Sequence, residues 1–375
     1  MLPKDHRAWV DVNTQALAHN IQCLQAWIGP QVALMAVVKA DAYGHGAVAV
    51  SETALAHGVK WLGVATIEEG AELRRAGLTC PILLMGATNT PEEVEAVAHW
   101  QLQPTICTPR QALTYAQTLT QPLTVHLKID TGMTRLGTRW EDALEFLRLV
   151  HHLPQIQVLG LYSHLATTSF VGGIAQQVER FEAVRIQAQA QGILPPLIHL
   201  SNSAGTLLCP SLHYDLVRVG IALYGLSPRP NLNHLPLQPV LAVKARITQV
   251  HRVPANTGVS YGHIFITERE STLATVAIGY ADGLPRNLSG KIDVLIHGQR
   301  VPQVGAITMD QCVIDVTGIS GVCEGDVVTF LGQEGEEVLC VETWADLLNT
   351  ISFEILCGFK HRLPRLVTAS ASSAY

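Results

Sequence analysis

Residues 124–164 read TVHLKIDTGMTRLGTRWEDALEFLRLVHHLPQIQVLGLYSH and contain one strand–helix–strand unit. The apolar runs at 124–130 and 158–164 are short and rich in β-branched and aliphatic residues. Between them, EDALEFLRLV (141–150) has helical periodicity and begins with acidic residues, as the helix dipole favours. Continuous apolar strands around an amphipathic helix are typical of parallel strands buried on both faces. This segment therefore predicts an α/β fold.

The same alternation extends along the chain in both directions and predicts eight strands. They are 35–41, 61–67, 81–87, 102–108, 124–130, 158–164, 197–203 and 216–225. Amphipathic helices at 68–77 and 90–100 separate the early strands. Eight strands with intervening helices are typical of a TIM-type (β/α)8 barrel, which is the fold that we expect. A doubly wound open sheet remains the alternative, because periodicity does not show whether a sheet closes.

After about residue 236 the pattern changes to short strands separated by Gly-, Asn- and Asp-bearing turns. Examples are LAVKARITQV (241–250), TLATVAIGYADG (272–283) and GDVVTFLG (325–332). We expect a barrel domain at 1–235 and a C-terminal all-β domain at 236–375, connected by NLNHLPLQP (231–239). The first about 10 residues are candidates to join the β-domain instead.

The composition excludes several classes of protein. The chain has 375 residues, of which 48% are hydrophobic and 15% charged, with a net charge of -6, so nucleic acid is not an expected partner. Mean hydropathy is +0.23, yet the apolar runs are far shorter than the roughly 20 residues that cross a membrane. The N-terminus MLPKDHRAWVDVN lacks the features of a secretory signal, so we expect a cytoplasmic protein with no membrane partner. Eight cysteines without a CxxC pair predict neither a metal site nor a disulfide framework.

Polar residues close several of the predicted strands, where the active site of a parallel barrel is built. They are Lys39, Asp41, Lys128, Asp130, His164, Asn202, Ser203 and, within the last strand, Arg218. A buried lysine at such a position requires a paired carboxylate or a lowered pKa suited to Schiff-base chemistry. A lysine at the rim with its ammonium in water is the alternative.

Lys39 belongs to AVVKADAYGHG (36–46), in which glycines and a tyrosine follow the lysine. Glycines at this place suit a tight turn that brings backbone close to a ligand. The run closely resembles the cofactor-lysine motif of the alanine racemases. The resemblance implies that Lys39 carries pyridoxal 5'-phosphate covalently and that Tyr43 lies beside its phosphate.

A second segment, LKIDTGMTRLG (127–137), resembles the family segment whose lysine is often carbamylated. The resemblance implies that Lys128 is that lysine and that Arg135 contacts both the cofactor ring and the substrate. A carbamate would turn a cation into an anion and would orient Arg135 by charge-assisted hydrogen bonds. An ordinary ion pair of Lys128, for example with Asp130, is the alternative.

Three further segments, SHLATT (163–168), HLSNSAG (199–205) and YDLVRVGIALYG (214–225), resemble cofactor-binding stretches of the family. By resemblance the cofactor-binding residues are His164 beneath the ring, Ser203 on the phosphate, Arg218 on the pyridine nitrogen, and the amides of Gly220 and Ile221 on the phosphate. A carboxylate facing the ring nitrogen would keep it protonated, whereas an always-charged arginine disfavours a second proton there. The ring is then a weaker electron sink, and side reactions such as transamination become less favourable.

The C-terminal part contains VSYGHIF (259–265), GYADG (279–283) and ITMDQ (307–311), which also resemble family motifs. They imply Tyr261 as a second catalytic base, Tyr280 at the substrate entrance, and Met309 and Asp310 as substrate-binding residues. In the family the residues at the positions of Tyr261, Met309 and Asp310 reach the cofactor of the other subunit, so the resemblance implies a homodimer with composite active sites. One departure is His361 in FKHRLPR (359–365), where many relatives have a tyrosine.

Together these motifs predict an alanine racemase that interconverts L-alanine and D-alanine and supplies D-alanine for peptidoglycan. Lys39 would act on the D-enantiomer and Tyr261 on the L-enantiomer. A racemase of another small amino acid, such as serine, would have nearly the same motifs. Decarboxylases with the same domain arrangement also use a lysine of the first strand, but the VSYG motif and the arginine of VRVGIALYG argue against this alternative. A non-catalytic pyridoxal-phosphate protein would not require the about 140 residues after the barrel.

Overall fold

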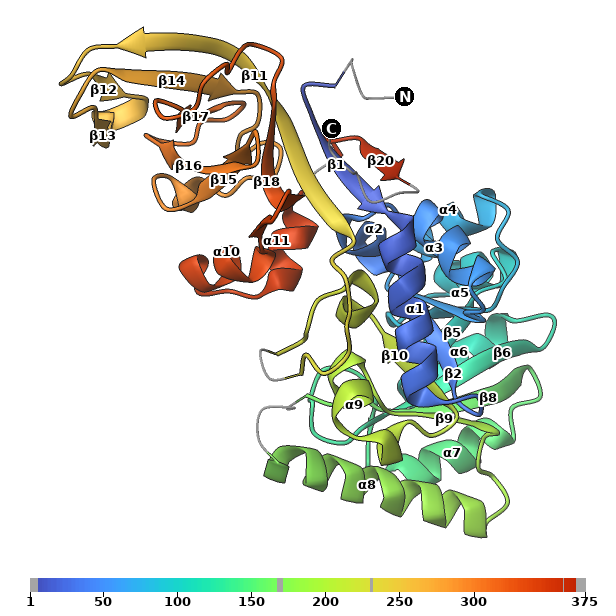
Figure 1. The fold of residues 1–375 in the computed structure, drawn as a ribbon. Coiled ribbons are helices and arrows are strands. Elements are labelled where there is room, and N and C mark those ends of the chain that lie inside the picture. The colour runs from blue at the N-terminus through green and yellow to red at the C-terminus, as the bar shows by residue number, and fades with distance from the viewer. Residues whose placement is uncertain (1–5, 167–170, 230–231, 360, 369–375) are drawn as a thin grey trace. The chain divides into compact units, whose positions relative to one another are not determined.

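The computed structural model describes residues 6–166, 171–229, 232–359 and 361–368 (Figure 1). Its contacts divide the chain into two compact units. The barrel unit comprises Leu17–Ala42 and Ala47–Gln238, and the β-unit comprises Met1–Ala16, Tyr43–Gly46 and Pro239–Tyr375. Residues 167–168 of the SHLATT motif and residue 231 of the predicted connection lie outside the described residues. Within the described ranges, no helix has the length and apolar character to cross a membrane.

The barrel unit is built on eight parallel strands in the order β10-β2-β3-β4-β5-β6-β8-β9. Their bounds are β2 (Ala33–Val37), β3 (Trp61–Val64), β4 (Ile82–Leu84), β5 (Gln103–Ile106), β6 (Leu123–Asp130), β8 (Ile156–Tyr162), β9 (Leu197–His199) and β10 (Leu216–Val219). The short β7 (Thr138–Arg139) pairs with β6. Backbone hydrogen bonds from Asp215 N to Ile198 O and from Arg218 N to Ser201 O, both 3.0 Å, close the ring between β9 and β10. The predicted barrel is thereby confirmed over the open sheet.

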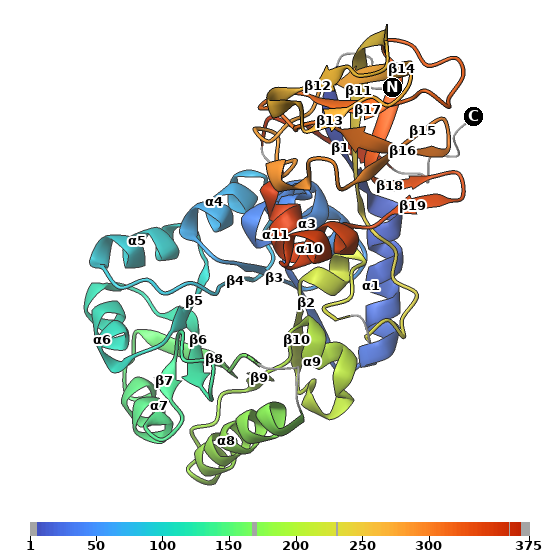
Figure 2. The same ribbon diagram turned by 90° about the vertical axis from the view of Figure 1, so that its left-hand side faces the viewer.

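Helices alternate with these strands and lie outside the ring, as Figure 2 shows for α4 to α8. The bounds are α1 (Thr14–Ile28), α2 (Lys39–Gly44), α3 (Ala47–Ala56), α4 (Ile67–Arg75), α5 (Pro91–His99), α6 (Pro109–Thr118), α7 (Ala143–His151), α8 (Val171–Ala190) and α9 (Ser203–Leu208). Short 3-10 helices follow at η1 (Pro210–Leu212) and η2 (Ile221–Tyr224). This alternation places the carboxyl end of each strand next to a loop that leads into a helix.

Capping boxes explain why two of these helices begin where they do. Thr66 precedes α4 and its side chain accepts from the backbone N of Glu69, whose carboxylate returns a bond to the cap. Thr90 and Glu93 form the same reciprocal pair at α5, with a proline in the first turn. Each pair satisfies backbone donors that a helix start leaves without intrahelical partners.

Several predicted strands are shorter in the structure. The strand predicted at 216–225 ends at Val219, and residues 221–224 form the 3-10 helix η2, closed by Gly225 at φ +83°. The strand predicted at 35–41 ends at Val37. Met35, Leu83 and Leu216 form a buried cluster that joins β2, β4 and β10. Apolar residues continue beyond the strands because the following turns are themselves buried.

The β-unit is a mostly antiparallel sheet in the order β19-β18-β15-β16-β17-β14-β11-β1-β20. The strands of this sheet are β1 (Ala8–Asn13), β11 (Leu241–Val253), β14 (Ser271–Val276), β15 (Asp293–Ile296), β16 (Gln299–Val304), β17 (Cys312–Asp315), β18 (Val327–Glu334), β19 (Glu337–Leu339) and β20 (Arg365–Thr368). β12 (Gly258–Val259) and β13 (Phe265–Ile266) form a separate two-stranded sheet. A further pairing of β18 with β11 closes six of the strands into a ring. β1 pairs with β11 antiparallel and with β20 parallel, so it belongs to this sheet.

The sequence predicts an all-β domain here. The unit is mostly β, and it also contains two α-helices. They are α10 (Val341–Leu348) and α11 (Ser352–Gly358), and 3-10 helices occur at η3 (Tyr261–His263) and η4 (Arg286–Leu288). In VETWADLL the apolar residues Val341, Trp344, Ala345 and Leu348 have helical spacing, and the first three are buried. This eight-residue pattern was the available signal for α10.

Candidate active site

The sequence predicts Lys39 near the end of a strand. In the structure the strand ends at Val37, and Lys39 begins a left-handed turn. It begins α2, in which four consecutive residues, 40–43, have φ between +52° and +55°. Each L-residue in this conformation costs roughly 1–2 kcal/mol. Such strain persists only where the surroundings impose it, and it is concentrated at functional sites.

Two carboxylates hold this turn. Glu69 accepts hydrogen bonds from Ala40 N at 2.7 Å through Oε1 and from Ala65 N at 2.6 Å through Oε2. Asp41 Oδ1 accepts from Ala47 N at 2.7 Å. The backbone on both sides of the turn is therefore tied by charge-assisted bonds.

Arg218 on β10 is a buried cation surrounded by neutral acceptors. Its side chain donates through Nη1 to His199 Nδ1 at 3.0 Å and through Nη2 to the carbonyls of Ser163 at 2.8 Å and Leu200 at 3.1 Å. In the described part of the chain Arg218 forms no ion pair with a carboxylate. Its hydrogen bonds there are made by Nη1 and Nη2, and none by Nε. Burial lowers the pKa of Arg218 to about 10, so the guanidinium stays charged at neutral pH.

His164 follows β8 and lies beside Arg218, and the charges of the other predicted cationic residues also act on it. Its Nδ1 lies 3.3 Å from Nη2 of Arg218. The pKa of His164 is lowered well below its usual range, first by burial and then by four cations, which are Arg218, Lys128, Arg135 and Lys39. Arg218 therefore lies beside a neutral imidazole on which the charges of the other three residues also act.

Lys128 on β6 is almost fully buried, with 5% of its surface exposed. Its Nζ lies 5.2 Å from the centroid of the Tyr162 ring. Asp130 Oδ1 instead accepts from the backbone N atoms of residues 132–134, and the alternative ion pair between Lys128 and Asp130 does not occur within the described residues. Burial and, next, the charge of Arg218 lower the pKa of Lys128 to about 8. A substantial neutral fraction of this amine is therefore present near neutral pH.

Arg135 lies in the turn that follows β6. Gly137 closes this turn at φ +119°, and a Cβ there would lie 3.0 Å from Lys128 O, so the close approach requires glycine. The charge of Arg135 contributes to the lowered pKa of Lys128, after burial and the charge of Arg218.

Ser203 and Gly220 meet at the carboxyl ends of β9 and β10. Ser203 Oγ accepts from Gly220 N at 3.0 Å and from Ala222 N at 3.4 Å. Ser203 starts α9, and Ile221 starts η2 directly after Gly220. Backbone N–H groups at such helix starts, together with a hydroxyl, make a small set of donors suited to an anion.

Tyr43 belongs by its contacts to the β-unit. Its ring packs against Phe353 of α11 with 5.9 Å between centroids, and burial raises its pKa. Gly44 lies beside it at φ +80°, where a Cβ would come within 2.5 Å of Leu356 O. The turn that starts at Lys39 thus ends packed in the β-unit.

The four site residues predicted in the C-terminal part are exposed. The exposed fractions are 73% for Tyr261, 41% for Tyr280, 53% for Met309 and 56% for Asp310. Their loops bond one another: Ser260 Oγ donates to Ala306 O at 2.7 Å, and Tyr280 N donates to Thr308 O at 3.0 Å. The β-unit therefore presents these side chains on adjoining loops.

An ion network that sequence reasoning missed supports Asp310. Arg362 Nη2 donates to Asp310 Oδ1 at 2.7 Å, and its Nε lies 3.4 Å from Asp282 Oδ1. Asp282 is fully buried and also binds Arg7 through both oxygens, at 2.6 and 3.1 Å. Residues more than 270 positions apart thus hold one loop, which no local pattern could indicate.

Sequence reasoning also missed a row of polar side chains inside the barrel. His199 Nε2 lies 3.0 Å from His126 Nδ1, and His126 Nε2 lies 3.2 Å from Gln103 Oε1. The signal was present, because His126 and Lys128 alternate along one strand and so share a face. A histidine in the middle of an apolar strand required a partner.

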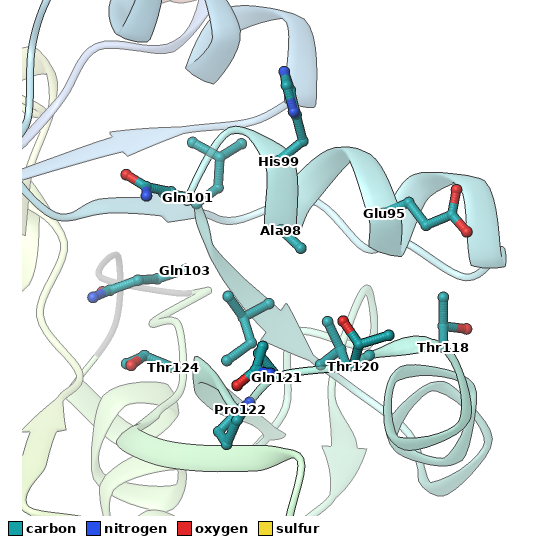
Figure 3. Close-up of a pocket in the computed structure, with 13 residues that line it drawn as sticks. Glu95, Ala98, His99, Gln101, Gln103, Thr118, Thr120, Gln121, Pro122 and Thr124 are labelled. Carbon is teal, nitrogen blue, oxygen red and sulfur yellow. The ribbon is translucent and has the colours of Figure 1, made fainter.

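A cavity of about 660 Å³ lies at the other end of the barrel, at the amino ends of β5 and β6 (Figure 3). It is lined by α5 and by the loops at 101–103 and 118–124. Active sites of parallel barrels lie at the carboxyl ends of the strands, where Arg218, His164 and Ser203 converge. This cavity is therefore separate from the candidate site.

Comparison with known proteins identifies the family. Residues 12–228 match the alanine racemase N-terminal domain and residues 240–367 match the alanine racemase C-terminal domain. The chain is 55% identical to the alanine racemase of Nostoc sp., over 96% of this chain and 95% of that protein.

Solved structures agree. The alanine racemase of the D-cycloserine producer Streptomyces lavendulae matches with a TM-score of 0.90 and 35% identity, covering 97% of this chain and 98% of that one. The alanine racemase of Bartonella henselae with covalently bound pyridoxal phosphate matches with a TM-score of 0.85 and 31% identity, covering 97% and 100% of the two chains. With both family domains matched over nearly the full length, this chain belongs to the alanine racemase family of isomerases.

Proposed function

We propose that this chain interconverts L-alanine and D-alanine with pyridoxal 5'-phosphate attached to Lys39. The observation that carries the proposal is the contact of Arg218 with His164 at 3.3 Å, at a place where the charges of Lys39, Lys128 and Arg135 also act. The homologues of known name and the covalent cofactor in the Bartonella henselae protein support it. We also propose that residues 1–235 bind the cofactor and that residues 236–375 supply the second base.

The residues present fit this cofactor. Ser203 Oγ and the amides of Gly220 and Ile221 would hold the phosphate, since neutral donors at helix starts suit a dianion. Arg218 keeps its Nε–H for the ring nitrogen, because its Nη atoms are engaged by protein acceptors. The family likeness adds Tyr43 at the phosphate and His164 beneath the ring. When bound, the cofactor supplies the electron-withdrawing ring that makes the Cα proton of an amino acid removable.

Arg218 decides how strongly that ring withdraws electrons. Its guanidinium is always charged and cannot accept a proton, so it disfavours a second proton on the ring nitrogen. The acceptors around Arg218 are neutral, which leaves its charge uncompensated. We propose that this arrangement favours racemisation over reactions that need a stronger electron sink.

Racemisation requires a proton to leave one face of Cα and another to arrive on the opposite face. We propose that Lys39 Nζ exchanges the proton with the D-enantiomer and that Tyr261 Oη exchanges it with the L-enantiomer. The exposure of Tyr261 leaves its hydroxyl accessible to a substrate. Arg135, Met309 and Asp310 would bind the substrate, and Tyr280 would line its entrance.

We propose that the enzyme is a homodimer in which Tyr261 acts on the cofactor of the partner subunit. Tyr261, Ile264 and Ile266 follow one another in the β-unit and are 73%, 61% and 55% exposed. Large apolar side chains exposed together are typical of an interaction surface. Dilution below the dimer dissociation constant should then abolish activity.

We propose that Lys128 is carbamylated. Only a neutral amine attacks carbon dioxide, and the lowered pKa of Lys128, about 8, supplies a neutral fraction near pH 7. The product is an anion among the cations Arg135 and Arg218, where its charge is stabilised. A carbonyl signal from carbon-13 bicarbonate that is lost in Lys128→Met would support the modification.

The first experiment is an absorbance spectrum of the purified protein, followed by borohydride reduction, peptide mapping and an assay of L-alanine conversion. We expect a bound chromophore, its reduction onto Lys39, and D-alanine as product. Cofactor on Lys39 without alanine racemisation would redirect the assignment to another amino acid, such as serine. No cofactor binding after addition of pyridoxal 5'-phosphate would overturn the proposal.

We further propose that the D-alanine serves peptidoglycan synthesis in the cytoplasm.

A further inference from the structure

A continuous row of polar side chains crosses the interior of the barrel unit. It runs from Gln103 at the start of β5, through His126 on β6 and His199 at the end of β9, to Arg218 on β10. The three contacts measure 3.2, 3.0 and 3.0 Å in that order. We infer that Gln103, His126 and His199 are positioning residues that aim the guanidinium of Arg218 and preserve its charge. This inference rests on the proposed function, in which Arg218 faces the cofactor ring.

The direction of every hydrogen bond in this chain follows from Arg218. An arginine can only donate, so His199 Nδ1 accepts and His199 must carry its proton on Nε2. That proton is donated to His126 Nδ1, so His126 carries its own proton on Nε2 and donates it to Gln103 Oε1. The opposite amide orientation of Gln103 would reverse both tautomers and place two donors between His199 and Arg218. Only one set of tautomers therefore satisfies all four residues.

The rings are held in place by packing as well as by these bonds. His199 stacks on Tyr162 with 4.5 Å between centroids and an interplanar angle of 11°. Trp61 meets the His126 ring edge-on at 5.6 Å. Gly160 makes room for that ring, because a Cβ at this position would lie 2.1 Å from His126 Nδ1. Neither imidazole can turn without displacing a neighbour.

Both rings are neutral, which matters for Arg218. Burial, more than the charge of Arg218, lowers the pKa of His126 to about 3 and that of His199 well below its usual range. A carboxylate in the place of His199 would neutralise the guanidinium, whereas a neutral imidazole orients it and leaves its charge intact. The chain cannot conduct protons, because Arg218 has no acceptor. Its role is therefore to fix orientation and charge.

Gln103 terminates the chain on the side of the barrel away from Arg218. Gln103 is one of the residues that line the cavity at the amino ends of β5 and β6, and Figure 3 shows it on the side opposite Glu95 and Thr118. The amide oxygen of Gln103 is the last acceptor of the row. Without it the Nε2–H of His126 would lose its hydrogen-bond acceptor. Gln103 thus accepts the last hydrogen bond of the row and holds the His126 ring, which lies two hydrogen bonds from Arg218.

The first test reads the tautomers directly in the purified enzyme, labelled with nitrogen-15 at histidine. We expect His199 and His126 to be neutral and protonated at Nε2, with Nδ1 as hydrogen-bond acceptor in both rings. Signals are assigned with the variants His126→Phe and His199→Asn. An Nδ1-protonated or charged His199 would overturn the inference, whatever the activity of the enzyme.

The second test measures turnover in variants of the chain. We expect His126→Phe to lower kcat roughly tenfold, the usual size of an outer-shell effect, and to shift the absorbance maximum of the bound cofactor. In His126→Asn the amide oxygen is bonded to Cγ, where histidine has its acceptor Nδ1. This variant should therefore restore most of kcat. KM for alanine should change less than about twofold in both, because Arg218 is not expected to touch the substrate.

Gln103→Leu addresses the other end of the chain and avoids the ring packing. It removes the acceptor of the His126 Nε2–H and should lower kcat by a smaller factor than His126→Phe. Gln121→Leu and His151→Phe, at exposed positions of the same unit, are the matched controls. Unchanged kcat in both Gln103→Leu and His126→Phe would overturn the inference. If the unaltered protein shows the expected tautomers but does not racemise alanine, the proposed function is overturned. The hydrogen-bonded row from Gln103 to Arg218 is then still supported.

Discussion

The barrel unit and the β-unit present their candidate residues in opposite ways. Arg218 and Lys128 are 2% and 5% exposed and are held by side chains from several strands, whereas Tyr261 and Asp310 are 73% and 56% exposed on loops. A buried polar group is oriented by the protein before any ligand arrives, and an exposed one is oriented only by what binds it. The barrel half of the site is therefore organised within one chain, and in the proposed homodimer a partner subunit would complete the β-unit half.

The largest effect is expected where the exposed half carries the chemistry. Tyr261→Phe removes the proposed base and should lower the turnover of L-alanine about a thousandfold, within the usual range for general bases. Reduction with borohydride should still attach the cofactor to Lys39. Tyr214→Phe is the matched control, since Tyr214 bonds Glu182 and is not one of the proposed site residues. Turnover in Tyr261→Phe equal to that of the unaltered enzyme would contradict the two-base proposal.

The next effect concerns the stability of the buried half. The folded protein lowers the pKa of Lys128 from its ordinary value of 10.5 to about 8, so between these values the unfolded chain binds more protons. Folding stability should therefore rise with pH across this window, by up to about 3 kcal/mol relative to Lys128→Met. Urea unfolding of both proteins in carbonate-free buffer at pH 8 and pH 10.5 measures the difference. A difference that does not change with pH would show that burial does not perturb Lys128.

A smaller effect is expected at the strained turn after Lys39. Glu69→Gln replaces one of two acceptor oxygens by a donor, which should cost about 1–2 kcal/mol and weaken cofactor attachment. Glu93→Gln is a close control, because Glu93 caps α5 through the same motif and makes no bond to the Lys39 turn. Thermal unfolding and cofactor titration compare the two. Equal cofactor affinity in both variants would refute a specific role for Glu69.

The smallest effect is expected in the ion network of the β-unit. Arg362→Gln removes the bond to Asp310, an exposed contact worth at most about 1 kcal/mol, so KM for alanine should rise less than about fivefold. Arg300→Gln breaks a comparable exposed ion pair with Glu337 and should leave KM unchanged. A large fall in kcat for Arg362→Gln would show that the exposed half is more rigid than the comparison implies.

The architecture of the barrel was readable because strands and helices leave local patterns. All eight predicted strands occur, although the last ends at Val219 and the first at Val37. These ends were placed too late because buried turns are as apolar as buried strands. In the β-unit, the helix Val341–Leu348 was overlooked, since an eight-residue amphipathic pattern is hard to distinguish among short strands.

The candidate site was predicted unevenly. Lys39, Lys128, Arg135 and Arg218 were named from motifs; Arg218 contacts His164, and the charges of all four lower the pKa of this imidazole. His126, His199 and Gln103 were missed, because their importance lies in contacts between strands and not in spacing along one strand. The left-handed conformation of residues 40–43 was likewise not visible, since none of these residues is glycine.

The sequence by itself determined the alternation of strands and helices, the residue types at the strand ends and the likeness to one enzyme family. These properties depend on residues near one another in the chain, whose periodicity and motif spacing are local. Only the tertiary structure decided that Lys128 sits beside Tyr162 without Asp130, and that Arg218 is held by neutral acceptors. Burial and long-range contact set the charge state of a side chain, and both arise only when distant strands meet.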